Sequence, residues 1–408
     1  MDSSNARVVI VGAGHAGGMV AANLRQYGFE GPIVLIGEEP LAPYQRPPLS
    51  KAWLKGEADG DSLLLKEPTW YAENGVDLRL GALATAIDLD ARTVTVGGEA
   101  INYDALVIAT GARARPLAIP GADLDGVLSL RSAADAEALK HRLGPGTRLA
   151  VVGGGYVGLE AAASAIALGG QATVLEREDR LLARVACAPL SRFYEAAHKR
   201  RGVEILTAAS VTALEGEDGK VTAVVLDDGR RIDCDVALVG VGALPNMELA
   251  EAAGLACSNG VVVDGEARTS DPRVWAVGDV TFRPLPLYDR VARLESVPSA
   301  LEMAKQAASA IAGRPQPPGE VPWFWSDQFD LKLQMAGLVF DCDQLVTRGD
   351  PDSERFALFH LKAGVIQAVE AVNAPQEFMG GRMLIQKKSV VDPAKLADVG
   401  VSMKDVAA

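Results

Sequence analysis

The sequence contains few cysteines, few aromatic residues and no long uninterrupted apolar segment. Its four cysteines, Cys187, Cys234, Cys257 and Cys342, show no C-x-x-C spacing, which argues against a disulfide framework, a thiol–disulfide active site and a metal cluster. No stretch approaches the roughly eighteen apolar residues of a membrane-spanning helix, and the first residues lack the basic and apolar regions of a secretion signal. We therefore expect a cytoplasmic protein that does not associate with membranes.

Basic side chains are also in deficit, because 40 Lys and Arg residues stand against 53 Asp and Glu residues, a formal net charge of −13. Such a surface repels a polyphosphate backbone, so nucleic-acid binding is not expected. The histidines His141, His198 and His360 are scattered, without a second metal ligand at helical spacing or a serine-elbow motif. We therefore predict no metal site and no hydrolytic centre. A chain of 408 residues is long enough for roughly two to four globular domains.

The most informative feature of the sequence is an internal repeat. Residues 8–17, VVIVGAGHAG, recur as residues 149–158, LAVVGGGYVG, at a displacement of 141 residues. In each copy a β-branched run leads into G-x-G-x-x-G and then into an alanine-rich stretch, which is the strand–turn–helix context of a dinucleotide-binding site. The duplication predicts two similar nucleotide sites, with helices over residues 19–27 and 159–168.

In such a motif the first glycine permits a tight turn, the second lets the backbone approach a pyrophosphate, and the third lets helix and strand pack closely. The free N–H groups and the positive dipole end of the helix then face the phosphates. Each copy continues into a strand that ends in an acid, Glu38 or Glu176, 26 or 23 residues after the first glycine. That distance is close to the ~20 residues expected of an acid that binds an adenosine ribose, so both sites favour adenine dinucleotides. The glycines are Gly12, Gly14 and Gly17 in the first copy and Gly153, Gly155 and Gly158 in the second.

Charge at the second site favours NADH over NADPH. Glu176 at the ribose position would repel a 2′-phosphate, whereas Arg177 and Arg184 nearby keep NADPH open as an alternative. In the first motif His15 fits either a phosphate contact or a plain spacer.

Three further apolar runs, residues 106–111, 236–242 and 274–279, are typical of central strands covered on both faces. After Ala312 the composition and the hydrophobic pattern of the sequence change. Residues 313–319 have the composition of a linker, residues 323–340 and 356–372 alternate like antiparallel strands, and residues 392–408 fit a final amphipathic helix or a fraying end. The predicted class is α/β, with two doubly wound, Rossmann-like domains followed by a smaller α+β domain.

Several motifs together carry a family resemblance. The glycine motifs are common to many flavoproteins, but Pro-Pro-Leu-Ser-Lys at residues 47–51 and Trp-Ser-Asp-Gln at residues 325–328 are far narrower. On these motifs the chain resembles, over essentially its whole length, the FAD-dependent ferredoxin reductases of bacterial oxygenase systems, of the putidaredoxin reductase type. The full set of strings that carry the resemblance is residues 9–17, 46–51, 109–111, 153–160, 277–279, 295–298 and 323–328.

The resemblance implies a glutathione-reductase-like architecture. It places an FAD-binding domain at residues 1–112 and 243–316, an NAD-binding domain at 113–242 and the C-terminal α+β domain at 317–408. Beside the reactive edge of the flavin it implies Lys51, Glu160 and Trp325. At FAD it implies Gly12, Gly14, Ala16, Glu38, Arg46, Lys51, Ala84, Thr110, Gly111, Arg131, Asp279 and Val297. At NADH it implies Gly153, Gly155, Gly158, Glu176 and Gly242.

The residues themselves support these roles unequally. Asp279 ends a strand, where ligand sites of open α/β sheets lie. Lys51 follows a stiff Pro-Pro pair and is suited to offset charge on a reduced flavin, but a surface lysine is equally consistent. Glu160 in the first turn of a helix also simply favours the helix dipole, and Trp325 is equally consistent with a core aromatic.

The implied function is hydride transfer from NADH to FAD, followed by one-electron transfers to a [2Fe–2S] ferredoxin. That ferredoxin would serve an oxygenase, either a cytochrome-type monooxygenase or a ring-hydroxylating dioxygenase. Hydride transfer requires no protein acid–base catalyst. Because such ferredoxins are acidic, Lys305, Arg314 and Lys332 are candidates for a basic docking patch.

Other activities remain open on the same scaffold. A rubredoxin reductase differs only in its partner, and an apoptosis-inducing-factor-like flavoprotein would bind NADH mainly as a switch. An NADH oxidase or a disulfide reductase is disfavoured, because the early loops contain no cysteine.

Overall fold

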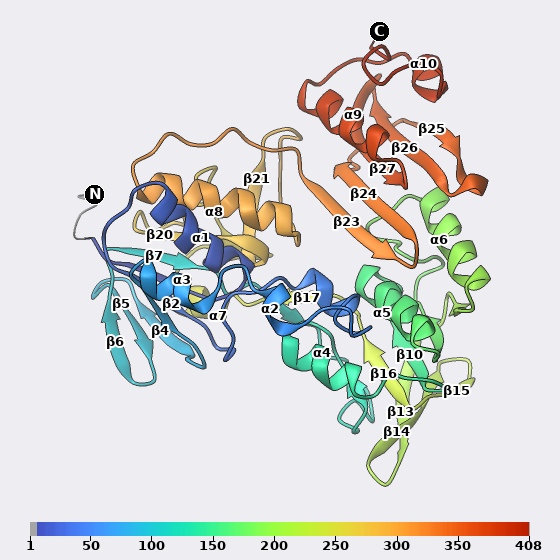
Figure 1. The fold of residues 1–408 in the computed structure, drawn as a ribbon, viewed down its shortest axis with the longest axis horizontal. Coiled ribbons are helices and arrows are strands. Elements are labelled where there is room, and N and C mark those ends of the chain that lie inside the picture. Colours follow the sequence, from blue (N-terminus) through green and yellow to red (C-terminus); the bar gives the residue numbers. More distant parts are fainter. Residues whose placement is uncertain (1–5, 408) are drawn as a thin grey trace. The chain divides into compact units, whose positions relative to one another are not determined.

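The computed structural model describes residues 6–407, and this part of the chain divides into two compact units (Figure 1). Unit 1 consists of residues 6–45, 60–113 and 244–324, and unit 2 of residues 46–59, 114–243 and 325–407. Each unit contains one copy of the glycine-rich repeat. The chain changes unit after residues 45, 59, 113, 243 and 324. The last three changes fall within β8 (Ala112–Ala114), β17 (Ala243–Pro245) and β23 (Trp323–Gln328).

Unit 1 is built on a five-stranded parallel sheet. Four of its strands are buried along their whole length, because the apolar, mostly β-branched runs predicted from the sequence are covered on both faces. Helix α1 (His15–Gln26) packs along α8 (Val297–Ile311), as Figure 1 shows. The strands lie in the order β20 (Val274–Ala276), β7 (Ala105–Ile108), β1 (Val8–Val11), β2 (Ile33–Ile36) and β3 (Val76–Arg79).

Two smaller sheets and several short helices complete unit 1. One sheet contains β4 (Ala84–Asp88), β5 (Thr93–Val96) and β6 (Glu99–Asn102). The other contains β18 (Cys257–Ser258), β19 (Gly260–Val262), β21 (Thr281–Leu285) and β22 (Arg290–Ala292). The helices are α2 (Gly60–Leu63), α3 (Pro68–Glu73), α7 (Glu248–Ala252) and the 3-10 helix η2 (Gly278–Val280).

Unit 2 repeats the parallel sheet around the second glycine motif. Its order is β12 (Glu204–Leu206), β11 (Gln171–Leu175), β10 (Arg148–Val152), β16 (Val236–Val239) and β9 (Val127–Leu128). The helices are the 3-10 helix η1 (Pro47–Ser50), α4 (Ala133–Lys140), α5 (Tyr156–Ala167) and α6 (Ala188–Arg200). A three-stranded antiparallel sheet contains β13 (Val211–Glu217), β14 (Lys220–Leu226) and β15 (Arg231–Asp233).

The last part of unit 2 is a five-stranded sheet with α9 (Pro375–Gln386) packed on β27. Leu331, Leu333 and Phe356 of this sheet share one hydrophobic core with Leu149 and Val151 of the parallel sheet. The sheet order is β23, β24 (Leu331–Gly337), β27 (Val365–Val372), β26 (Arg355–Lys362) and β25 (Gln344–Asp350), with the 3-10 helix η3 (Pro351–Ser353) between β25 and β26. The two parallel sheets and this α+β region confirm the predicted fold class.

Residues 392–408 were predicted to form either a final helix or a fraying end, and the first alternative was wrong for most of that range. Only α10 (Pro393–Ala397) is helical, and Ala408 lies outside the described residues. The buried guanidinium of Arg348 binds one main-chain carbonyl of α10 and two carbonyls beyond it, where the chain is no longer helical. The carbonyls belong to Leu396, Asp398 and Val401, at 3.1, 2.5 and 2.8 Å from guanidinium nitrogens. No helix within residues 6–407 is long and apolar enough to cross a membrane.

Candidate functional site

The first glycine-rich turn forms an open cradle at the start of α1. Gly12 has a φ of +111°, and a Cβ there would lie 2.2 Å from the Ala109 carbonyl oxygen. A Cβ on Gly17 would lie 2.0 Å from the Gly12 oxygen, so helix and turn are in close contact. In contrast, a Cβ built on Gly14, the N-cap residue, would meet no described residue within 4 Å apart from its neighbours along the chain. Helical N–H groups therefore face open space, which suits a phosphate.

The second glycine-rich turn, at the start of α5, has the same construction. Gly153 has a φ of +109°, and its Cβ would lie 2.5 Å from the Gly240 oxygen. A Cβ on Gly158 would lie 2.5 Å from the Gly153 oxygen, whereas one on Gly155 would meet nothing among the described residues within 4 Å. The crowding and the open space thus fall at the glycines where the dinucleotide motif requires them.

The acid after the second motif is held against its own glycine turn. Glu176 accepts hydrogen bonds from the Gly154 N–H at 2.7 Å through Oε2 and from the Glu178 N–H at 2.8 Å through Oε1. Each carboxylate oxygen keeps a further lone pair for a ribose hydroxyl. The exposed Arg177 is paired with Glu178 at 2.8 Å, so this cation is already engaged. Glu38 is exposed just after β2.

Lys51 and Glu160, which are 109 residues apart in the chain, form an ion pair inside unit 2. The Lys51 Nζ lies 2.6 Å from Glu160 Oε2, and it also donates to the Pro47 carbonyl oxygen at 2.9 Å. The side chains are 18% and 5% exposed, so Lys51 is not an ordinary surface lysine. A carboxylate this deeply buried is stable only if it is well paired and hydrogen-bonded.

Glu160 receives two further hydrogen bonds, one through each oxygen. Ser50 Oγ donates to Oε2 at 2.5 Å, and Ser326 Oγ on β23 donates to Oε1 at 2.6 Å. Gln328 Nε2 donates to Ser326 Oγ at 3.0 Å, which directs the Ser326 proton toward Glu160. The carboxyl group of Glu160 is therefore an acceptor in every one of these contacts, as an ionised carboxylate is.

The chain of hydrogen bonds ends at a buried histidine. His198 Nε2 donates to Gln328 Oε1 at 2.8 Å, and the imidazole is fully buried on α6. Burial lowers the pKa of His198 to about 4, so the ring is neutral at neutral pH. His198 donates to Gln328, Gln328 donates to Ser326, and Ser326 donates to Glu160, so the hydrogen bonds all run toward the carboxylate. We call Lys51, Ser50, Glu160, Ser326, Gln328 and His198 the Glu160 network.

Sequence reasoning identified two of these six residues. Ser50 stands within the quoted Pro-Pro-Leu-Ser-Lys string, and Ser326 and Gln328 within Trp-Ser-Asp-Gln. The alternation of a strand places residues 326 and 328 on one face, a signal that could have found them. It also directs the adjacent Trp325 to the other face of β23. His198 gave no sequence signal, because its partner is 130 residues away.

Other predicted residues are fixed by local contacts. Arg46 Nη1 donates to the Arg131 carbonyl oxygen at 2.7 Å, which brings these two positions together. Thr110 Oγ1 donates to the Asn246 oxygen at 2.7 Å, and Asn246 Nδ2 donates back to the Thr110 oxygen at 2.9 Å. Asn246 was missed from the sequence. Asp279 lies in η2, directly after β20.

The predicted site residues are divided between the two units. Those of unit 1 are Gly12, Gly14, Ala16, Glu38, Ala84, Thr110, Gly111, Asp279 and Val297. Those of unit 2 are Arg46, Lys51, Arg131, Gly153, Gly155, Gly158, Glu160, Glu176, Gly242 and Trp325.

The cysteines are unsuited to redox catalysis. All four are free thiols, and burial raises the pKa of each, in the case of Cys234 to about 11. Because the thiolate is the reactive form, none of these thiols is activated as a nucleophile at neutral pH.

Comparison with known proteins identifies two families along the chain. Residues 6–307 match the pyridine nucleotide-disulphide oxidoreductase family, and residues 323–407 match the reductase C-terminal family. The chain is 52% identical over 407 residues to the probable ferredoxin reductase CtmF of Castellaniella defragrans, covering 99% of this chain and 100% of the relative. It is 42% identical to the putidaredoxin reductase CamA of Pseudomonas putida over 412 residues, covering 100% and 98%. The crystal structure of the covalent putidaredoxin reductase–putidaredoxin complex matches 99% of this chain and 98% of its own chain, with a TM-score of 0.97 and 42% identity.

Proposed function

Because this chain belongs to the pyridine nucleotide-disulphide oxidoreductase family, we propose that it is an NADH-dependent ferredoxin reductase of an oxygenase system. Its electrons would pass from NADH through FAD to a [2Fe–2S] ferredoxin. The observation that carries the proposal is the relationship to ferredoxin reductases along the whole chain, C-terminal domain included. The two open glycine cradles support it, because they provide for two dinucleotides.

The family uses FAD and NAD(H), and the residues present fit both. The cradle at Gly14 would hold the FAD pyrophosphate, with Glu38 at its adenosine ribose. The cradle at Gly155 would hold NADH, with Glu176 at its ribose, where the carboxylate disfavours a 2′-phosphate. A bound FAD would supply a hydride acceptor for NADH and a one-electron donor for the ferredoxin.

The remaining assignments to FAD and NADH follow the family positions. Asp279 would bind the ribityl chain. Arg46 and Arg131 already contact each other, which supports a common role at the flavin. The other proposed FAD residues are Gly12, Ala16, Ala84, Thr110, Gly111 and Val297, and the other proposed NADH residues are Gly153, Gly158 and Gly242.

Lys51 is the residue that we assign to the reactive edge of the flavin, together with Glu160 and Trp325. The Lys51 ammonium is fixed by the Pro47 carbonyl and by Glu160, so it would stabilise negative charge on the reduced flavin without reorganising. Glu160 positions the ammonium and is itself held by Ser50 and Ser326. None of these groups needs to transfer a proton during hydride transfer.

The domain assignment that accompanies this function follows the glutathione-reductase-like plan. Residues 1–112 and 243–316 would bind FAD, residues 113–242 would bind NADH, and residues 317–408 would form the C-terminal domain. The protein would act in the cytoplasm, where NADH and soluble ferredoxins are available.

Lys305 and Arg314 of unit 1 and Lys332 of unit 2 are the basic residues that we propose, each by itself, as contacts for an acidic ferredoxin. Lys305 lies 3.2 Å from the Glu320 carboxylate, and Arg314 Nε donates to the Tyr27 carbonyl oxygen at 2.9 Å, which leaves the Arg314 charge uncompensated in that contact. Lys332 is exposed on β24. Reversing all three charges should slow electron transfer at low salt and flatten its salt dependence. An unchanged salt dependence would remove these residues from the docking surface.

Anaerobic stopped-flow kinetics test the function directly. The flavin-loaded protein is reduced with one equivalent of NADH and mixed with an oxidised [2Fe–2S] ferredoxin, with a rubredoxin, or with buffer, and flavin reoxidation is followed. Fast reoxidation by the ferredoxin alone is expected. Fast reoxidation by rubredoxin would move the assignment to a rubredoxin reductase, and slow transfer to both would indicate an NADH-binding flavoprotein that is not an electron donor.

A further inference from the structure

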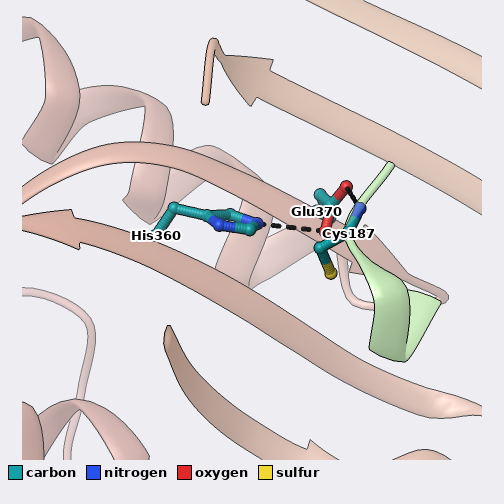
Figure 2. Close-up of side chains that lie close together, drawn as sticks. All are labelled: Cys187, His360 and Glu370. Carbon is teal, nitrogen blue, oxygen red and sulfur yellow. Dashed lines mark hydrogen bonds and ion pairs between the residues drawn. The ribbon is translucent and has the colours of Figure 1, made fainter. Parts of the chain in front are cut away.

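Three side chains of the kinds that bind metals lie together in unit 2, apart from the Glu160 network. Cys187 is the N-cap residue of α6, His360 lies on β26, and Glu370 lies on the adjacent β27 (Figure 2). A thiol sulfur, an imidazole nitrogen and a carboxylate oxygen of these residues all lie within 4.8 Å of one another. No sequence motif indicates this group, because Cys187 is more than 170 residues from the other two.

The imidazole nitrogen and one carboxylate oxygen lie near the separation of two ligand atoms in a tetrahedral zinc site. His360 Nε2 lies 3.1 Å from Glu370 Oε2, and the Cys187 N–H donates to Glu370 Oε1 at 3.0 Å. With Zn–N and Zn–O distances of ~2.1 Å and a Zn–S distance of ~2.3 Å, tetrahedral ligand atoms are about 3.4 to 3.6 Å apart. The imidazole and the carboxylate would therefore move apart by only a few tenths of an ångström to accept the ion.

Two of the three side chains of this group are buried. Glu370 is fully buried and His360 is 4% exposed, and both lie on strands whose Leu358 and Val372 belong to the hydrophobic core. The Glu370 carboxylate is bound by His360 Nε2 and by the Cys187 N–H, and a cation at this site would take the place of the first contact. Cys187, the N-cap residue of α6, is only partly buried.

The structure assigns to Cys187, His360 and Glu370 a site for a divalent cation of the Zn²⁺ class. A thiolate and a carboxylate together neutralise one Zn²⁺, so the buried site stays uncharged when the ion is bound. Three protein ligands leave the fourth position to water. The site is independent of the proposed electron transfer, because it uses none of the residues assigned to FAD or NADH.

Metal binding at this site would connect separate elements of unit 2. The bound ion would join the start of α6 to the sheet of β26 and β27 and thereby stabilise unit 2.

The test is zinc binding by the flavin-loaded, full-length protein. The protein is treated with a chelator and dialysed to equilibrium against low-micromolar Zn²⁺, and metal per chain is counted by atomic emission. We expect one equivalent of zinc and a higher thermal midpoint in the zinc-loaded protein. Replacing Zn²⁺ by Cd²⁺ should produce a thiolate-to-metal absorption band in the ultraviolet.

Variants locate the ion. Cys187→Ala keeps the main-chain N–H that binds Glu370 and should lose the zinc, the thermal shift and the Cd²⁺ band. Cys257→Ala removes another partly buried thiol and should change nothing. His141→Gln removes an exposed histidine that pairs with Glu137 on the same helix, which is the place for adventitious surface binding.

Three results would overturn the assignment. They are a wild-type protein that takes up no zinc, a Cys187→Ala variant that binds as much as the wild type, and a His141→Gln variant that loses the metal. Flavin content and circular dichroism establish that each variant is folded. If Cys187→Ala is unstable, Glu370→Gln is used in its place. This variant should also lose the bound zinc and the thermal shift, and binding equal to that of the wild type would overturn the assignment.

Discussion

Replacing Lys51 by Met should destabilise unit 2 because it leaves the Glu160 carboxylate buried without its counter-charge. At the observed 2.6 Å and an effective dielectric constant of about 20, the gross attraction is about 6 kcal/mol. Desolvation offsets part of it, and the Lys51 side chain is 18% exposed. Ser50 and Ser326 also continue to bind the carboxylate. Breaking a buried pair costs about 3–5 kcal/mol, so we expect a loss near the lower end, about 3 kcal/mol.

Differential scanning calorimetry of the flavin-loaded protein measures this effect. For a domain of about 200 residues a loss of 3 kcal/mol lowers the thermal midpoint by roughly 6 to 12 °C. The matched controls are Glu160→Gln and the double variant Lys51→Met/Glu160→Gln, which has no buried charge left at this position. The double variant should regain at least half of the loss, since the penalty of Lys51→Met arises from the unpaired carboxylate.

The same variants separate stability from chemistry. If Lys51 stabilises the reduced flavin, the rate of flavin reduction by NADH should fall by at least about tenfold in the double variant although its stability recovers. A midpoint shift of less than about 2 °C in Lys51→Met, or a double variant no more stable than the single one, would refute the buried-charge reasoning. An unchanged reduction rate would refute only the assignment of Lys51 to the flavin.

Three further predictions address the cradles, the buried histidine and the coenzyme. Gly14→Ala should fold but lose at least about tenfold in FAD affinity by fluorescence titration, because its Cβ enters the open cradle, whereas Gly12→Ala should misfold by circular dichroism. The pKa of His198 is about 4 in the folded protein and about 6.5 in the unfolded chain. The contribution of His198 to the free energy of unfolding is therefore fully present above pH 6.5 and falls by about 3 kcal/mol as the pH drops to 4. Urea titrations at pH 7 and 4.5 should show this loss reduced in His198→Gln but unchanged in His141→Gln, and equal losses in all three proteins would contradict it. Glu176→Ser should raise the ratio of kcat/KM for NADPH to that for NADH by at least about tenfold, and an unaltered ratio would place the carboxylate away from the ribose.

The sequence by itself determined the features that depend on a few consecutive residues. A β-branched strand, a glycine turn and the start of a helix are local events, so the motifs at Gly12 and Gly153 predicted both the parallel sheets and the open cradles. The glycines that crowd the backbone and the glycines that face open space fall where the motif places them. The alternating hydrophobic pattern after Ala312 likewise predicted the antiparallel sheet, because alternation along a strand is a local pattern.

Only the tertiary structure decided which distant side chains meet. The sequence left Lys51 equally consistent with a surface residue, and the burial of Glu160 within reach of it resolved that question. His198 and His360 looked scattered, yet one ends the Glu160 network and the other lies against Cys187 and Glu370. The main-chain carbonyls after α10 are likewise bound by a residue about fifty positions earlier in the sequence, Arg348. Contacts across a hundred residues or more depend on how helices and sheets pack, and the local order of the chain does not specify that packing.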